Sequence, residues 1–484
     1  MTVPFLNYPV NNRNPGTYFE VNASLANTGQ RNRRALIVAP SIVPGPAVPT
    51  LCTSNAQAQV LAGTGSAGAR MFYNYVKQDS FGETWLLPVQ DNPAGTQGTQ
   101  VTTYAGLATE TGTWTQNICG TTVQALVTVG MTPTALTAAL AAALNAIPTA
   151  FMTATASANT LTCTARNRGP LDITGVVGPP PGDAPLPAGL TVFTQVTNLG
   201  SGPPDYTLAL ANCGEQPFDI IVAPTTDTAT LDSFRDFLSD SIGRWNPLHQ
   251  LFGMGFAAMN ASLGVATAAL TARNDQHMMI LPVFGSETPA WQIAALCAGS
   301  VATSLRNDPG VPLRGIALGF KAPRIEQRYS FKERNILLYD GGSTFTVGND
   351  NVPRVSRLVT TYQQNASGVP DDSYLDIGTL FQLQDEIEFY QADLSTVYQN
   401  KKLVPDGTRF GAGSIDVTTA QIIGLHVVAL YREREEAGRV VDSPGFKKAM
   451  RSENAGGGRV FIYAPIRLAS GLQIIATLVA FTKP

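Results

Sequence analysis

Between residues 218 and 318, short apolar runs alternate with helix-like segments, and this alternation restricts the possible folds more than any other feature of the chain. The apolar runs have the length and composition of buried strands. We predict strands at 218–223, 255–259, 277–284 and 314–318, and helices at 230–238, 261–273 and 289–305. Strands and helices that alternate across short loops predict an α/β layer with a largely parallel sheet.

The first hundred residues add elements to the same layer, and a different kind of segment then interrupts it. Near residue 95 charge becomes scarce, and Thr, Ala and Gly are frequent until Pro204. We interpret 98–204 as a β-rich module inserted into the α/β layer. The predicted elements of the layer are strands at 34–40 and 84–89 and helices at 54–61 and 66–77, and those of the module are strands at 122–129 and 159–165 and a helix that starts at Thr134 and ends before Pro148.

Beyond residue 350 the pattern becomes mixed α+β. We predict an amphipathic helix at 374–390 and strands at 422–431 and 460–466. Ten β-prone residues, 472–481, follow a flexible Ser470–Gly471 pair. A strand this apolar needs a sheet edge to pair with.

Residues 1–24 are predicted to form a second extended arm, because a strand-like run at 16–21 follows many turn-forming residues. The polar link 22–33 contains a dozen residues, which reach about 40 Å when extended. That reach is enough to cross to a neighbouring subunit. The arm residues that we expect to pair between subunits are Thr17, Tyr18, Phe19, Val21, Ile474, Ile475, Leu478 and Phe481.

The charge content indicates a surface that neighbours cover. Charged residues make up 14% of the 484 residues, against about 25% in an average soluble domain. No run of about 20 apolar residues predicts a membrane span, and the N-terminus lacks a signal-peptide pattern. A net charge of −3 does not favour a nucleic-acid-binding protein. We therefore expect no nucleic acid partner and no membrane insertion.

A glycine-rich segment, Gly63-Thr-Gly-Ser-Ala-Gly68, matches the dinucleotide-binding pattern GxGxxG. That chemistry needs a strand before the loop, so that a helix N-terminus meets the pyrophosphate. Here residues 54–61 look helical, so we interpret the glycines as a helix stop followed by a Ser-capped helix. We expect no cofactor.

The reactive side chains do not form a catalytic or metal-binding pattern. His249, His277 and His426 lie in unrelated contexts, and the latter two lie in or beside apolar runs. Asp371 and Asp372 resemble a turn and a helix cap. Cys52, Cys119, Cys163, Cys213 and Cys297 show no metal or disulfide spacing. We expect no metal site, no catalytic residues and reduced thiols, although an α/β enzyme with a β-rich insert remains a distant alternative.

One short basic helix stands out in this weakly charged chain. Residues 445–451 bring together Lys447, Lys448 and Arg451. A solubilising surface is one interpretation of such a cluster. A docking surface for an acidic partner is the other.

Several segments, taken in chain order, resemble the contractile tail sheath proteins of the Mu-like group. The residues that carry the resemblance are 3–7, 14–20, 27–29, 34–38, 61–66, 332–338, 354–374 and 401–403. The departure lies near the C-terminus, where Asn454–Gly458 stands in place of the family's Pro-rich loop.

The resemblance implies a structural subunit that forms stacked hexameric rings around an inner tail tube and contracts to drive the tube through a target envelope. It also implies contacts with the tube (Lys447, Lys448 and Arg451), the baseplate and the tail terminator, in a virion tail assembled in the host bacterial cytoplasm. A contractile bacteriocin or injection device is the alternative setting. The expected parts are an N-terminal arm (1–24), an α/β middle domain (25–97 and 205–350), an inserted outer domain (98–204), an α+β inner domain (351–470) and a C-terminal arm (471–484).

Overall fold

The computed structural model describes residues 33–173, 184–410 and 416–480. The chain divides into two units, 1–32 and 33–484, and the fold below is that of the second unit. The predicted arm at 1–24 lies outside the described residues. No described helix combines the length and the apolar character that crossing a bilayer requires.

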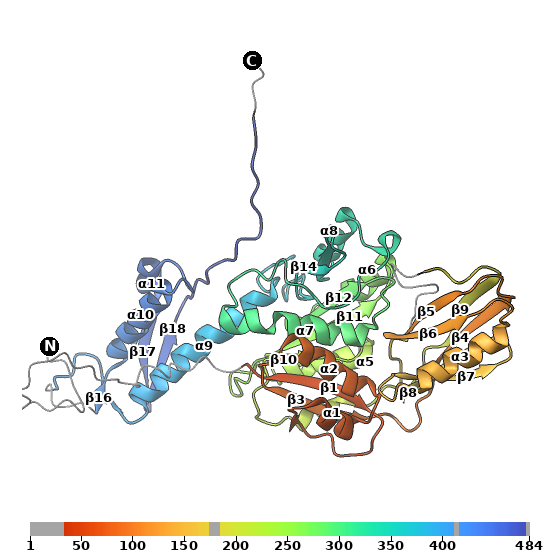
Figure 1. The fold of residues 1–484 in the computed structure, drawn as a ribbon. Helices are drawn as coiled ribbons and strands as arrows, with labels where there is room; N and C mark the ends of the chain where they lie inside the picture. The colour runs from red at the N-terminus through yellow and green to blue at the C-terminus, as the bar shows by residue number, and fades with distance from the viewer. Residues whose placement is uncertain (1–32, 174–183, 411–415, 481–484) are drawn as a thin grey trace, which may run out of the picture. The chain divides into compact units, whose positions relative to one another are not determined.

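A six-stranded sheet forms the centre of the unit, in the order β12-β11-β10-β1-β3-β2 (Figure 1). The first five of these strands are parallel, and the short β2 is antiparallel to β3. Central parallel strands are apolar throughout because helices cover both faces, and every residue of β1 and β12 is buried. The strands are β1 (Ala35–Ser41), β2 (Thr50–Leu51), β3 (Thr84–Gln90), β10 (Ile220–Val222), β11 (Met254–Asn260) and β12 (Met278–Val283).

Two apolar cores lie on opposite faces of this sheet. Alternate residues of a strand point to opposite faces, and accordingly Ile37 belongs to one core while Leu36 and Val38 belong to the other. The first core is covered by α1 (Asn55–Ala62), α2 (Ala67–Gln78) and α7 (Ala290–Asn307). The second is covered by α4 (Tyr206–Ala211), α5 (Thr228–Leu238), α6 (Leu263–Thr271) and α8 (Phe331–Tyr339). The predicted α/β layer is therefore present.

The described residues between 97 and 198 form two antiparallel sheets and a helix between β3 and α4. Four strands pair in the order β7-β8-β4-β9, and β5 pairs with β6 as a hairpin. The helix α3 begins after Thr132, whose hydroxyl accepts a hydrogen bond from the Ala135 amide, and Pro133 occupies its first turn. The elements are β4 (Gln97–Gly106), β5 (Gly112–Ile118), β6 (Thr121–Val127), α3 (Pro133–Asn145), β7 (Met152–Ser157), β8 (Thr160–Arg168) and β9 (Leu190–Asn198).

The C-terminal part consists of helices and short two-stranded sheets. A small core of Val427, Val428, Tyr431, Val440 and Phe446 holds it together. Its elements are β13 (Thr344–Val347), β14 (Pro353–Arg357), α9 (Ile377–Tyr398), β15 (Lys402–Leu403), β16 (Val417–Thr418), α10 (Ala420–Glu436), α11 (Ser443–Ala449), β17 (Arg451–Gly456) and β18 (Arg459–Tyr463), preceded by the 3-10 turn η2 (Ile325–Gln327).

The strand prediction at 422–431 is wrong, because these residues lie within α10. Ala420, Ile423, Val427 and Tyr431 are buried at the three- and four-residue spacing of one helix face. Thr419 caps the helix, since its hydroxyl accepts a hydrogen bond from the Ile422 amide at 3.2 Å. Packing of this face outweighs the strand preference of Ile and Val.

The strand prediction at 314–318 is also wrong. The segment forms only an isolated bridge to β14, Ala317 with Arg354, although backbone hydrogen bonds on both sides of the bridge join it to β14. Gly315 and Gly319 adopt positive φ angles of 86° and 69°, which break the extended backbone on both sides of the bridge.

Candidate assembly surfaces

The glycine-rich segment 63–68 connects two helices, as the sequence predicts. Gly63, with φ of 92°, ends α1. The Ser66 hydroxyl then accepts a hydrogen bond from the Ala69 amide at 3.1 Å and starts α2. Because a helix and not a strand precedes the loop, it lacks the geometry of a dinucleotide site.

The helix N-termini of the α/β layer contact the inserted segment. The carboxyl edge of a parallel sheet is where open α/β folds bind ligands. Here the Asn167 carboxamide accepts from the Ala67 amide at the start of α2, at 2.7 Å, and the Asp172 carboxylate accepts from the Ala290 amide at the start of α7, at 2.8 Å. Amides that would otherwise receive a ligand are thus bonded to the chain itself.

Ring packing and a hydrogen bond to a carboxylate also join the inserted segment to the α/β layer. The Phe151 and Trp291 rings lie 4.9 Å apart, in one continuous core. Asn167 also donates to the Asp91 carboxylate at 3.0 Å, and burial raises the pKa of Asp91 to about 6. The sequence analysis did not identify Asn167 or Asp172, because single polar residues in a Thr-rich segment carry no recognisable pattern.

The histidines and acidic residues do not converge. Burial lowers the pKa of His277 to about 3, and its ring stacks on Trp245 at 4.4 Å. His426 lies between Tyr398 and Asp393 on the α9–α10 pair. Asp371 forms the predicted turn with Ser373, whereas the N-cap of α9 is Asp376. Within the described ranges no three His, Cys, Asp or Glu side chains could hold a metal ion.

The cysteines form no site either. Cys52, Cys119, Cys163, Cys213 and Cys297 are all buried and unpaired. Burial raises the pKa of the Cys163 thiol to about 12, so this thiol is protonated and unreactive at neutral pH.

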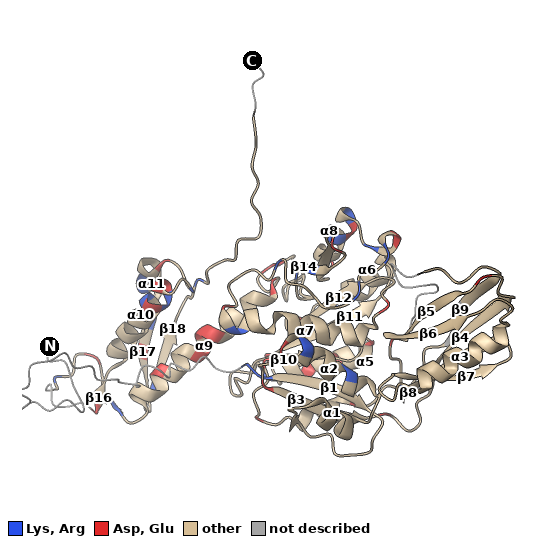
Figure 2. Cartoon of the chain, in the orientation of Figure 1, with Lys and Arg blue, Asp and Glu red and all other residues tan. Residues whose placement is uncertain are grey.

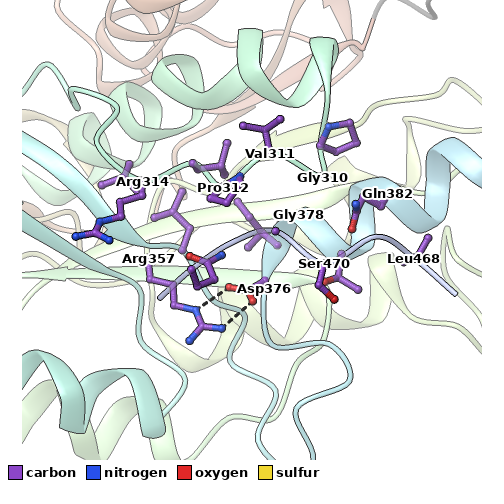
Figure 3. Close-up of a pocket in the computed structure, with 18 of the residues that line it drawn as sticks. Gly310, Val311, Pro312, Arg314, Arg357, Asp376, Gly378, Gln382, Leu468 and Ser470 are labelled. Carbon is purple, nitrogen blue, oxygen red and sulfur yellow. Dashed lines mark hydrogen bonds and ion pairs between the residues drawn. The ribbon is translucent and has the colours of Figure 1, made fainter. Parts of the chain in front are cut away.

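A cavity of about 190 Å³ lies where residues 468–473 cross the loop 309–312 (Figure 3). Two of its charged lining residues pair with each other, because the Arg357 guanidinium contacts both Asp376 carboxylate oxygens at 2.8 Å. The Gln382 amide donates to the Ala469 carbonyl at 2.9 Å. The cavity therefore lies at the base of the C-terminal segment, which one of its lining residues holds by a hydrogen bond.

Residues 467–469 are anchored by the backbone. The Val441 amide donates to the Arg467 carbonyl at 3.0 Å, and the Ala469 amide donates to the Arg439 carbonyl at 2.9 Å. Val440 and Leu468 form the antiparallel bridge between them.

Beyond this bridge the chain has no strand partner within the described residues. Leu472, Ile474, Ile475 and Leu478 are 70%, 78%, 78% and 95% exposed. Figure 1 shows the segment leaving the bridge as unpaired chain. The predicted strand at 472–481 is therefore not formed in the isolated chain, and Phe481 lies outside the described residues, as do Thr17, Tyr18, Phe19 and Val21.

The predicted basic helix is α11, and its apolar side is fixed. Phe446 stacks on Tyr431 with ring centroids 3.8 Å apart. Lys447, Lys448 and Arg451 are exposed, and the ion pairs found among the described residues do not include them. Lys447 and Lys448 lie on the helix, whereas Arg451 lies beyond its end as the first residue of β17, so the predicted helix ends earlier than 451.

Arg33, the first described residue, is buried at the junction of the layer and α9. Its guanidinium donates to the Leu305 carbonyl at 3.1 Å and to the Phe381 carbonyl at 3.2 Å. Asp219 lies 3.9 Å away. The polar link predicted at 22–33 therefore ends at a fixed point.

Comparison with known proteins identifies the family. The family described as "Phage tail sheath protein central domain" matches residues 200–361. The Mu-like prophage FluMu tail sheath protein of Haemophilus influenzae is 30% identical over 490 residues, which cover 99% of this chain and 100% of the relative. The chain belongs to the phage tail sheath family.

Solved structures of sheath tail proteins from two other bacteria are similar to this chain. The sheath tail protein of Listeria innocua is 11% identical, and the match covers 90% of this chain and 92% of that chain with a TM-score of 0.50. The sheath tail protein of Desulfitobacterium hafniense is 13% identical, with coverage of 95% and 97% and a TM-score of 0.48.

Proposed function

We propose that the chain polymerises by donating its C-terminal segment, residues 472–480, as a strand to a neighbouring subunit. The observation that carries the proposal is the exposure of Leu472, Ile474, Ile475 and Leu478 on a segment without a strand partner in the described chain. An apolar β-prone segment is stabilised when it adds to an open sheet edge. Each backbone hydrogen bond gained contributes about 0.5–1.5 kcal/mol net.

The β17–β18 hairpin is the acceptor that we propose. It is a two-stranded sheet, so each strand has an open edge, and Phe461 and Tyr463 are 57% and 63% exposed. The alternative acceptor at 422–431 is excluded because those residues are helical. We extend the proposal to Thr17, Tyr18, Phe19 and Val21 of the N-terminal arm on the basis of their composition.

The assembled form that we propose is a sheath of stacked hexameric rings around an inner tail tube. Contraction of the sheath would drive the tube through the target envelope, with the work supplied by contacts between subunits and no catalytic activity. Membership of the tail sheath family supports this role. On the same ground we propose that the sheath contacts the baseplate and the tail terminator and is assembled in the host bacterial cytoplasm. A contractile bacteriocin-like or injection device would use the same subunit. We also propose 98–204 as the outer domain and 351–470 as the inner domain.

Two variants of the arms test the proposal. Deleting residues 1–22, or substituting Ile475→Pro, should leave a folded soluble chain that no longer forms tubes, since proline removes a hydrogen bond from the ladder. Ile475→Val is the matched control and should assemble normally. Circular dichroism reports folding, and negative-stain electron microscopy reports assembly. Full-length sheaths formed by either deficient variant would contradict the donated-strand proposal for that arm.

A further inference from the structure

The first of two exposed surfaces lies on α8 and the turn before it, and we call it the α8 patch (Ile325, Phe331, Lys332 and Tyr339). Ile325, Phe331 and Tyr339 are 79%, 77% and 80% exposed. Residues 324–334 contain four basic and two acidic side chains, and Glu333 is bonded to the Ser330 amide at 2.7 Å. Figure 2 shows the basic residues of α8 in blue. The surface is therefore both apolar and positively charged.

The second surface lies on the loop between α5 and β11, and we call it the loop patch (Asp240, Ile242 and Leu248). Ile242 and Leu248 are 74% and 92% exposed. The Asp240 carboxylate contacts the Gln276 amide and, at 2.9 Å, the His277 ring. Burial keeps this ring neutral at pH 7, so the negative charge of Asp240 is not neutralised by either contact.

The loop patch is held in place by the chain beneath it. The Arg244 guanidinium donates to the Phe252 carbonyl at 2.9 Å, and the Trp245 indole donates to the Gly253 carbonyl at 2.8 Å. Trp245 also stacks on His277. A surface ordered in this way loses little conformational entropy when a partner binds.

The two patches lie at opposite edges of the parallel sheet. The loop patch directly precedes β11 and packs on His277, which precedes β12, so it lies at the amino edge. The α8 patch lies at the carboxyl edge, because Tyr329 donates to the carbonyl of Ala261, just after β11. The Gln327 side chain lies against Gly285, just after β12. Different surfaces are thus exposed at the two ends of one layer.

We propose that the α8 patch of one copy binds the loop patch of the next copy. Both patches expose large apolar side chains, and the basic surplus of one complements the unneutralised Asp240 of the other. Because two different surfaces meet, the contact repeats head to tail and produces a ring or a helix of subunits. The inference rests on the proposed polymerisation and assigns part of it to surfaces outside the arms.

Substitution of the apolar side chains is the first test, in the full-length chain. Phe331→Ser and Leu248→Ser remove exposed groups, so each variant should fold as the unaltered chain does. Each should raise the critical concentration for tube formation, measured by light scattering and microscopy, by about tenfold or more. Leu126→Ser on β6, where Leu126 is 64% exposed, is the matched control and should leave it unchanged.

Mixing charge variants tests the head-to-tail geometry. The variants Lys332→Glu and Asp240→Lys should each assemble poorly alone, because each substitution places charges of the same sign on both sides of the contact. An equimolar mixture should form more tubes than either variant at the same total concentration, because the unaltered basic patch of one meets the unaltered acidic patch of the other. Normal assembly of both Ser variants, or two deficient charge variants without gain on mixing, would overturn the patch contact and leave the sheath proposal standing. Failure of the unaltered chain to assemble at any concentration or salt would overturn both.

Discussion

Asp91 is a carboxylate whose surroundings oppose its ionisation. It lies at the end of β3, where the Arg168 amide donates to it at 2.8 Å, yet burial dominates and raises its pKa to about 6. An unfolded Asp titrates near pH 3.9. Between about pH 4 and pH 6 the folded chain therefore binds more protons than the unfolded chain, and lowering the pH through this window increases the free energy of unfolding.

Substitution Asp91→Asn should remove this component of the pH dependence. We expect the unfolding free energy of the unaltered chain to gain about 1–3 kcal/mol from Asp91 protonation between pH 7 and pH 4.5. The difference in unfolding free energy between the unaltered chain and the variant should therefore change by that amount between pH 7 and pH 4.5. Urea unfolding at both pH values measures it, and parallel pH curves would contradict the assignment.

At the scale of elements, the insert is joined to the layer by a few buried polar contacts. Asn167 is 1% exposed and bonds both to the start of α2 and to Asp91. Substitution Asn167→Ala would leave an amide and a carboxylate buried with fewer partners, so the free energy of unfolding should fall by about 2–4 kcal/mol.

The exposed Asn159 is the matched control for this substitution. Its side-chain amide donates to the backbone carbonyl of Tyr104 at 3.0 Å. Because water can replace that contact, Asn159→Ala should cost less than about 1 kcal/mol. Urea unfolding measures both values. An equal decrease in the free energy of unfolding in the two variants would contradict a larger contribution from the Asn167 contacts.

The sequence predicted the elements of the layer well, because apolar runs such as 34–40 and 277–284 are buried on both faces and leave a clear pattern. The prediction failed at 422–431, where β-branched residues occupy a helix that one packed face stabilises. The exposed C-terminal arm residues and the basic helix could be found from composition. The contacts of Asn167 and Arg33 could not, because each joins residues far apart in the sequence.

At the scale of the whole molecule, α11 is the surface that we propose to face the inner tube. Lys447 and Lys448 lie on this short helix, which the Phe446–Tyr431 stack fixes, and Arg451 begins the strand that follows it. Exposed ion pairs are individually weak, and repetition over many subunits would make them effective together. Such contacts would hold a sheath extended and still release it.

Charge reversal at Lys447 and Lys448 should therefore alter the assembled form and not the fold. We expect the double variant Lys447→Glu and Lys448→Glu to assemble directly into contracted sheaths that contain no tube. Electron microscopy of co-expressed sheath and tube proteins measures this. Lys401→Glu with Lys402→Glu is the matched control on another exposed pair and should give tube-bound sheaths. If the Lys447→Glu, Lys448→Glu variant formed normal extended sheaths around the tube, α11 would not be the tube-facing surface.

The bridge at Val440 and Leu468 has a mechanical consequence for a subunit that is pulled by its arm. Its two backbone hydrogen bonds run across the direction of the chain. A force along residues 467–469 therefore loads both bonds in shear, and they must break together, whereas a force across the segment would open them one after the other. The Gln382 contact to Ala469 shares the same load. When a subunit is pulled along its C-terminal arm, residues 467–469 would thus stay bound to the subunit. The segment beyond Ser470, which has no such hydrogen bonds in the described chain, would extend or reorient instead.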